Sequence, residues 1–206
     1  MLNTKFLLII GAAFMMNTAS AQKIILGAKA GIQSTAFSIR SISSDNKISI
    51  ESPRTGFMLG ATAEYQLSPD WSLQPHLLAT MRNGAINVGE AKTRIIAIDL
   101  PLNVLYRQDN FFIGAGPNFS YGLSAKAIPY EDAAKEHNFY STADDGIQLK
   151  RFELGANALI GYEFTSGLTV AANYTRGLTD ILHIENEAKV HTRMFGISIG
   201  YLFNKR

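Results

Sequence analysis

The residues of this chain best suited to chemistry are its four histidines, His76, His137, His183 and His191. His183 and His191 flank Glu185 and Glu187, and these side-chain types can ligate a metal or act as general acid and base. Their spacing does not match HExxH. The chain has no cysteine, which excludes thiol catalysis and cysteine-ligated metal. We therefore predict no catalytic residue, no metal site and no cofactor. An enzyme that uses His183, Glu185 and His191 is a minor alternative.

A second group consists of charged residues isolated within nearly uncharged, alternating segments. Its members are Lys29, Glu64, Arg82, Asp99, Arg107, Arg151, Glu153 and Glu163. Four are basic and four are acidic, as expected if they pair in a confined space, because an unpaired buried charge is costly. We predict a structural charge network, with a proton or ion path as the alternative.

The segment 126–149 combines acidic residues with aromatic ones. Five acidic residues against two lysines give it a net charge of −3. Loops on a rigid scaffold often carry binding residues, so this segment is the best candidate for recognition. An ordinary solvated loop is the alternative. The candidate recognition residues are Tyr130, Glu131, Asp132, Phe139 and Tyr140.

The segments that position these side chains alternate hydrophobic residues with small or polar ones, with the period of two that indicates β-strands. The eight segments are 26–33, 57–66, 71–82, 96–107, 111–122, 151–163, 168–175 and 195–203. Tight turns at 68–70, 108–110 and 165–167 alternate with longer connections at 39–54, 83–93, 126–149 and 178–190. This alternation predicts an all-β fold, an eight-stranded antiparallel up-and-down barrel.

The composition of the two strand faces predicts that this barrel crosses a membrane. Charged residues make up 17% of the chain, below the ~25% of ordinary soluble domains. The polar face is mainly Gly, Ser, Thr, Asn and Gln, which suits the crowded lumen of a small barrel. The apolar face carries aromatic residues near the strand ends, as lipid-facing girdles do. Membrane lipid is therefore the first predicted partner. A soluble sandwich or lipocalin-like barrel is the alternative.

Nucleic acid is excluded as a partner, because the net charge is only +2 and no basic block occurs.

The N-terminal residues have the pattern of an export signal. Lys5 precedes the apolar run 6–16, and Ala19-Ser20-Ala21 fits the small-residue cleavage site. We expect a signal peptide at 1–21, cleaved after Ala21, and an outer-membrane barrel domain at 22–206. The expected location is the bacterial outer membrane.

Four segments in order resemble a known family. They are 67–78 (LSPDWSLQPHLL), 98–106 (IDLPLNVLY), 112–121 (FIGAGPNFSY) and 167–181 (GLTVAANYTRGLTDI). Together they resemble the PorT-like outer-membrane β-barrel proteins of Bacteroidetes. The family often has an acidic residue where this chain has His76. It also has prolines where this chain has Pro101 and Pro117, at which we expect bulges or kinks.

The resemblance implies location and fold more directly than activity. The member that names the family is linked to secretion of proteases across the outer membrane. We therefore expect a non-enzymatic protein with a structural or interaction role, accessory to protein export, whose partners are other envelope or secretion proteins. A small-solute pore and a lipid-modifying outer-membrane enzyme are the alternatives. The oligomeric state is left open.

Overall fold

The computed structural model describes residues 24–41, 47–48, 53–84, 91–129, 137–138, 140, 149–181 and 188–203. The expected signal peptide and its cleavage site lie outside these residues. Four of the five candidate recognition residues also lie outside them: Tyr130, Glu131, Asp132 and Phe139.

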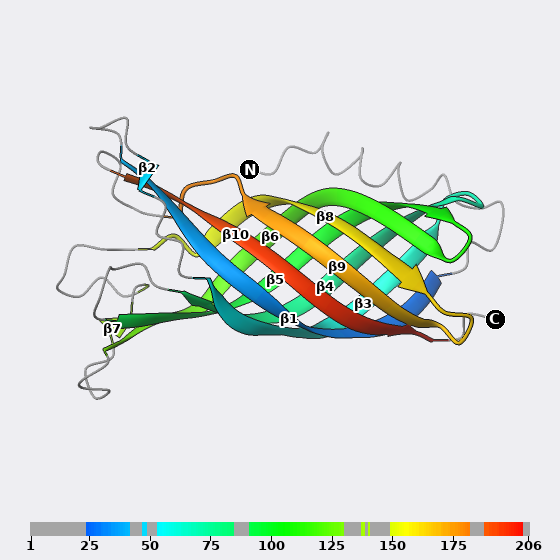
Figure 1. Cartoon of the computed structure of the whole chain (residues 1–206), viewed down its shortest axis with the longest axis horizontal. Helices are drawn as coiled ribbons and strands as arrows, with labels where there is room; N and C mark the ends of the chain where they lie inside the picture. Colours follow the sequence, from blue (N-terminus) through cyan, green and yellow to red (C-terminus); the bar gives the residue numbers. More distant parts are fainter. Residues whose placement is uncertain are drawn as a thin grey trace, which may run out of the picture.

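Eight long strands form the wall of a closed barrel (Figure 1). They are β1 (Ile24–Ser41), β3 (Arg54–Gln66), β4 (Trp71–Gly84), β5 (Ala91–Gln108), β6 (Phe111–Pro129), β8 (Phe152–Glu163), β9 (Leu168–Gly177) and β10 (Ala188–Leu202). Each pairs antiparallel with its neighbour, and β10 pairs back onto β1 to close the sheet. The two-residue strands β2 (Lys47–Ile48) and β7 (His137–Asn138) pair antiparallel with the loop-end parts of β1 and β6. The predicted eight-stranded antiparallel barrel is confirmed.

The two ends of the barrel differ in their connections. Tight turns join β3 to β4, β5 to β6 and β8 to β9 at one end, which we call the turn end; β1 begins and β10 ends there as well (Figure 1). Asp109 and Gly167 adopt positive φ angles of 54° and 86° in two of these turns, a conformation that Asp tolerates and Gly favours. All the longer connections leave from the opposite end, the loop end.

Several strands run farther toward the loop end than the alternation predicted. β6 continues to Pro129, inside the segment expected to be a loop, and β5 starts at Ala91. The ladder between them continues because backbone hydrogen bonds do not require the side chains to keep alternating.

The two mid-strand prolines do not form the expected bulges. Pro101 pairs with Asn118, and the β5–β6 ladder then skips Leu102 and Asn103 before resuming in the same register. The register shift in this pair of strands lies instead between Ile96 and Ala97. A proline lacks a donor, so the ladder loses contacts locally without an inserted residue.

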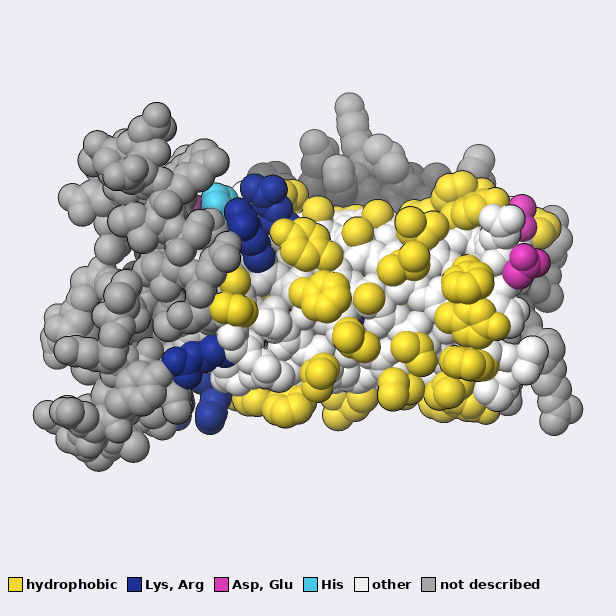
Figure 2. Space-filling view, viewed as in Figure 1, with side chains coloured by type: hydrophobic (Ala, Val, Ile, Leu, Met, Phe, Trp, Pro, Cys, Tyr) yellow, Lys and Arg dark blue, Asp and Glu magenta, His cyan; other side chains and the backbone are white. Residues whose placement is uncertain are grey.

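The barrel is apolar outside and polar inside. Large hydrophobic side chains are exposed over the whole wall, with Leu59 at 65% and Phe111 at 62%, and Figure 2 shows them spread over the strands. Thr, Ser, Asn and Gln side chains are buried in the lumen. A wall with this polarity is stable in lipid, where the closed ladder leaves no backbone edge unpaired. Among the described residues, no helix is both long and apolar enough to span a membrane.

Candidate functional site

The lumen is the part of the fold where polar and charged side chains converge, and it is organised in layers. Nearest the turn end, Arg107 donates to Glu64 and to Glu163, each at 2.6 Å. Gln74 donates to the same Glu64 carboxylate at 3.3 Å, and the Arg107 guanidinium lies 5.2 Å from the ring centre of Phe112. One arginine from β5 thus links carboxylates from β3 and β8 across the barrel.

The middle of the lumen holds mainly neutral polar groups. Thr175 donates to Asn157 at 2.7 Å, and Asn157 donates to Asn103 at 2.9 Å. A cavity of about 20 Å³, lined by Lys29 and His76 among others, lies at this level. Both ring nitrogens of His76 are buried, and within the described residues they meet no hydrogen-bond partner. A cavity of that size holds about one water molecule.

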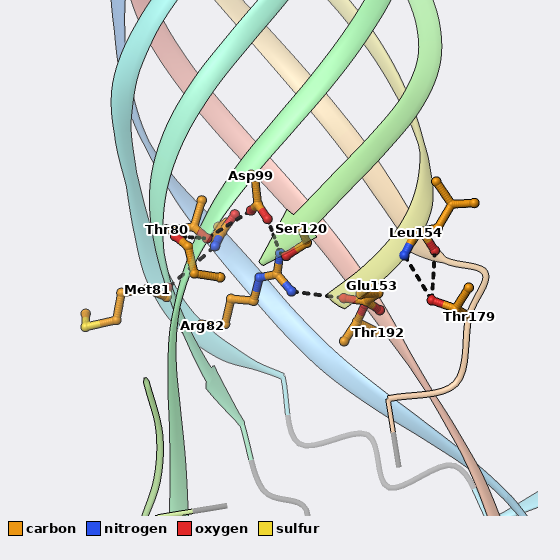
Figure 3. Close-up of polar contacts among 11 residues, drawn as sticks. Thr80, Met81, Arg82, Asp99, Ser120, Glu153, Leu154, Thr179 and Thr192 are labelled. Atoms are coloured by element: carbon orange, nitrogen blue, oxygen red, sulfur yellow. Dashed lines mark hydrogen bonds and ion pairs between the residues drawn. The ribbon is translucent and has the colours of Figure 1, made fainter. Parts of the chain in front are cut away.

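A second arginine layer lies toward the loop end (Figure 3). Arg82 is 3% exposed and pairs with Asp99 and with Glu153, the latter at 3.1 Å. It also donates to the Ser120 hydroxyl at 2.7 Å. Thr80 donates to Asp99 at 2.9 Å, and Thr192 donates to Glu153. Side chains from β4, β5, β6, β8 and β10 therefore meet at one point in the lumen.

An apolar cluster closes the lumen on the loop-end side of this layer. Phe37, Ile95, Ala125, Leu149, Ile181 and Val190 form it, and Tyr140 packs against it. Leu149 and Ile181 come from the connecting segments beside β8 and β9, so loop residues fold over the barrel mouth. The cavity between this cluster and Arg82 again measures about 20 Å³.

The structure brings most of the predicted charge network together, but it leaves two members apart. Lys29 lies in the lumen wall, and no carboxylate of the described part of the chain forms an ion pair with it. Arg151 likewise forms no ion pair with a carboxylate of the described residues. It is exposed just before β8 and donates to the carbonyls of Gly122 and Leu123, each at 3.1 Å. The alternation of β8 does not extend to it because the strand begins at Phe152.

Tyr140 is the one predicted recognition residue within the described part of the chain. Its ring lies 4.4 Å from the Arg151 guanidinium, and it packs on the apolar cluster rather than projecting outward. Burial raises the pKa of the Tyr140 phenol, an effect that the nearby Arg82 and Arg151 oppose.

Sequence reasoning missed two features of the site. It did not identify the neutral partners Thr80, Ser120 and Thr192, although each stands on the lumen-facing side of its strand. Nor did it identify the apolar cluster, because Leu149 and Ile181 lie in segments without strand periodicity. Within the described residues, no three His, Asp or Glu side chains gather as a metal site. The arrangement can hold charges in place and block passage.

Comparison with known proteins identifies the family of this chain and proteins with a similar fold. The family model described as "Outer membrane protein beta-barrel domain" matches residues 19–183. The crystal structure of Neisserial surface protein A is similar, with a TM-score of 0.53 and 12% identity over 86% of this chain and 97% of that one. The crystal structure of Ail, the attachment invasion locus protein of Yersinia pestis, in complex with the heparin analogue sucrose octasulfate is also similar. Its TM-score is 0.50, with 13% identity over 87% of this chain and 99% of that one. At such identities the likeness concerns the fold alone. No curated protein matches the chain.

Proposed function

The chain belongs to the outer membrane protein beta-barrel domain family, and from that membership we propose that it is a sealed, non-enzymatic barrel acting through contacts with other envelope proteins. In this proposal the protein is a PorT-like protein of Bacteroidetes, and its role is accessory to protein export. The ordered segments 67–78, 98–106, 112–121 and 167–181 support this assignment. The long connections face outward and the tight turns face the periplasm, as in other outer-membrane barrels.

The filled lumen is the observation that carries the proposal. Two arginine layers and the apolar cluster occupy it in series, and the cavities beside them measure about 20 Å³ each. A solute larger than water would have to displace buried ion pairs, which is costly. Contacts at the rim and loops therefore have stronger support than transport through the barrel.

Deletion of the gene tests the export role. We expect lower amounts of secreted and surface-displayed proteins, measured by quantitative proteomics of medium and cell surface, with recovery when the intact gene is restored. Co-purification from native outer membrane should then yield components of the export machinery. Unchanged secretion in the deletion strain would contradict the export role.

Planar-bilayer recording separates the proposal from the pore alternative. The purified protein should insert without a stable conductance. Arg107→Ala removes the turn-end layer, but the Arg82 layer and the apolar cluster should still block the lumen, so this variant should also show no stable conductance. A stable conductance in the unsubstituted protein would favour the pore.

Two further assays address the enzyme alternative and the signal peptide. Incubation with the purified protein should leave the mass spectrum of lipopolysaccharide unchanged, and any deacylated product would refute the non-enzymatic assignment.

The intact mass of protein from outer membranes should correspond to a chain that begins at Gln22. A chain that still begins at Met1 would contradict the proposed cleavage after Ala21.

A further inference from the structure

The middle of the lumen contains polar groups whose hydrogen-bonding capacity is not used within the described part of the chain. Both ring nitrogens of His76, the Nδ2 of Asn103 and the Oδ1 of Asn173 are buried there without a hydrogen-bond partner. All three residues line the same cavity of about 20 Å³. Buried polar atoms are almost always hydrogen-bonded, so unpaired atoms gathered at one cavity indicate a site for a small ligand.

Lys29 reaches this cavity from β1. Its neighbours in register are Gly60 on β3 and Gly200 on β10. Residues in register share a face of the sheet, and a glycine has no side chain to place there, so the lumen on both sides of the lysine stem stays open. No ion pair joins Lys29 to a carboxylate of the described residues, so its ammonium group brings further donors to the cavity.

The charges around the cavity disfavour an ion as its occupant. On β5, Asp99, Pro101 and Asn103 line the cavity, and Arg107 lies farther toward the turn end, so the cavity is situated between the two arginine layers. Each layer combines one arginine with two carboxylates, a net charge of −1. An anion would therefore meet excess negative charge on both sides, and a cation would lie beside Lys29. The occupant that fits is uncharged.

The unpaired groups include both donors and acceptors. Lys29 and the Nδ2 of Asn103 can only donate, whereas the Oδ1 of Asn173 and one nitrogen of a neutral His76 ring accept. A water molecule both accepts and donates hydrogen bonds, and buried waters form between two and four of them. A cavity of about 20 Å³ also has the size for one water.

We propose that this cavity is a binding site for one water molecule that is a fixed part of the lumen. The water accepts hydrogen bonds from Lys29 and Asn103. It donates to His76 and Asn173. These residues stand on β1, β5, β4 and β9, so the water joins four strands across the lumen, and one of them is β1, which closes the barrel against β10. The inference is independent of the export role, so failure of the export experiment leaves it intact.

The chain offers a matched pair of substitutions on β4. His76→Phe keeps an aromatic ring but removes both ring nitrogens from the cavity. Gln74 is the preceding lumen-facing residue of the strand; it is also buried, donates to Glu64 at 3.3 Å and does not line the cavity. Gln74→Met therefore replaces a buried polar side chain by an apolar one of similar length without touching the proposed site.

The experiment is crystallography of the full-length protein at a resolution that shows ordered water, with crystals grown in bromide. We expect a density peak within hydrogen-bond distance of Asn103 Nδ2 and Lys29 Nζ, without the anomalous signal of bromide. The peak should be lost in His76→Phe and retained in Gln74→Met. Each variant is first checked for heat-modifiable migration in detergent gels. The unsubstituted protein alone tests occupancy and the bromide signal, so the proposal stays falsifiable if His76→Phe fails to fold.

Three outcomes would overturn the proposal. The first is a cavity without density in the unsubstituted protein. The second is an anomalous bromide peak in the cavity, which would show an anion site. The third is an equal effect of the two substitutions on the peak, whether loss or retention, which would show that the polar groups of the cavity do not hold the water.

Discussion

Arg82 and Arg107, inside the barrel, are each shared by two carboxylates. Because one arginine serves two carboxylates, the loss of stability depends on which partner is removed. Arg82 lies between Asp99 and Glu153, and Arg107 lies between Glu64 and Glu163. Removal of one carboxylate leaves each arginine still paired. Removal of an arginine leaves two negative groups facing each other where water is scarce, which is the costlier change.

We predict that Arg82→Ala lowers the free energy of unfolding by about 3–5 kcal/mol, the range for removing one partner of a buried ion pair. The measurement is urea unfolding of the refolded protein in lipid vesicles, followed by the fluorescence of Trp71, the single tryptophan. The exposed Arg94→Ala is the control and should change stability by less than about 1 kcal/mol. Equal losses in the two variants would contradict the structural role of Arg82.

The raised pKa of Tyr140 predicts a loosening of the loop end at alkaline pH. Its folded-state pKa lies above the ordinary value of 10.0 because burial disfavours the phenolate. The stability it contributes is therefore fully present below pH 10 and is lost as pH rises through the folded-state pKa. Absorbance titration should show a late-ionising tyrosine that is missing in Tyr140→Phe. Identical titration curves for the two proteins would refute this assignment.

At the level of strands, the wall depends on how closely neighbouring backbones approach. Gly116 on β6 faces the backbone of β5, and a Cβ placed there would collide with the carbonyl of Leu102. The β5–β6 ladder lacks pairs at Leu102 and Asn103, beside Pro101, although both residues pair with β4 on their other side. A collision with backbone can be relieved only if the two strands separate, since a carbonyl cannot rotate away as a side chain does.

Gly116→Ala should therefore reduce stability by roughly 1–3 kcal/mol, the usual cost of overpacking. Gly200→Ala is the matched control, because the nearest atom to its Cβ is the hydroxyl of Thr169, a side chain that can turn aside, and the nearest carbonyl oxygen, that of Ala28, is 3.1 Å away, farther than that of Leu102 from a Cβ at Gly116. Urea midpoints of the two variants in the same vesicles provide the comparison. A Gly200→Ala variant as unstable as Gly116→Ala would show that backbone contact is not the cause.

At the scale of the whole molecule, stability comes from closure of the sheet. β10 pairs with β9 on one side and with β1 on the other, so every strand of the wall has two neighbours. In lipid, an unpaired strand edge costs several kcal/mol for each exposed backbone group. Folding of the barrel should therefore be all or none.

We predict that unboiled protein migrates differently from boiled protein in detergent gels and that deletion of residues 196–206 abolishes this difference. The deletion removes the turn-end half of the ladder between β10 and β1, seven of its fifteen register pairs, and so leaves β1 and β9 with open edges there. Deletion of residues 132–135, which belong to no described strand, is the control and should preserve the shift. Retention of the shift after the C-terminal deletion would contradict the requirement for closure.

The sequence by itself determined the strands, their outward and inward faces and the eight-stranded barrel. This information is local, because a period of two in side-chain polarity depends only on neighbouring residues. The same alternation is sufficient to assign Arg82, Asp99 and Glu153 to the inner face of the wall.

Only the tertiary structure decided which of these residues meet. Arg82 and Glu153 are 71 positions apart, and Arg107 and Glu163 are 56 apart, so their contact depends on the register and stagger of every strand between them. Among the described residues, the same register leaves Lys29 outside the ion pairs and sets Arg176 opposite Arg193. Alternation specifies a face but carries no information about height along the barrel, and height decides which charges pair within the lumen.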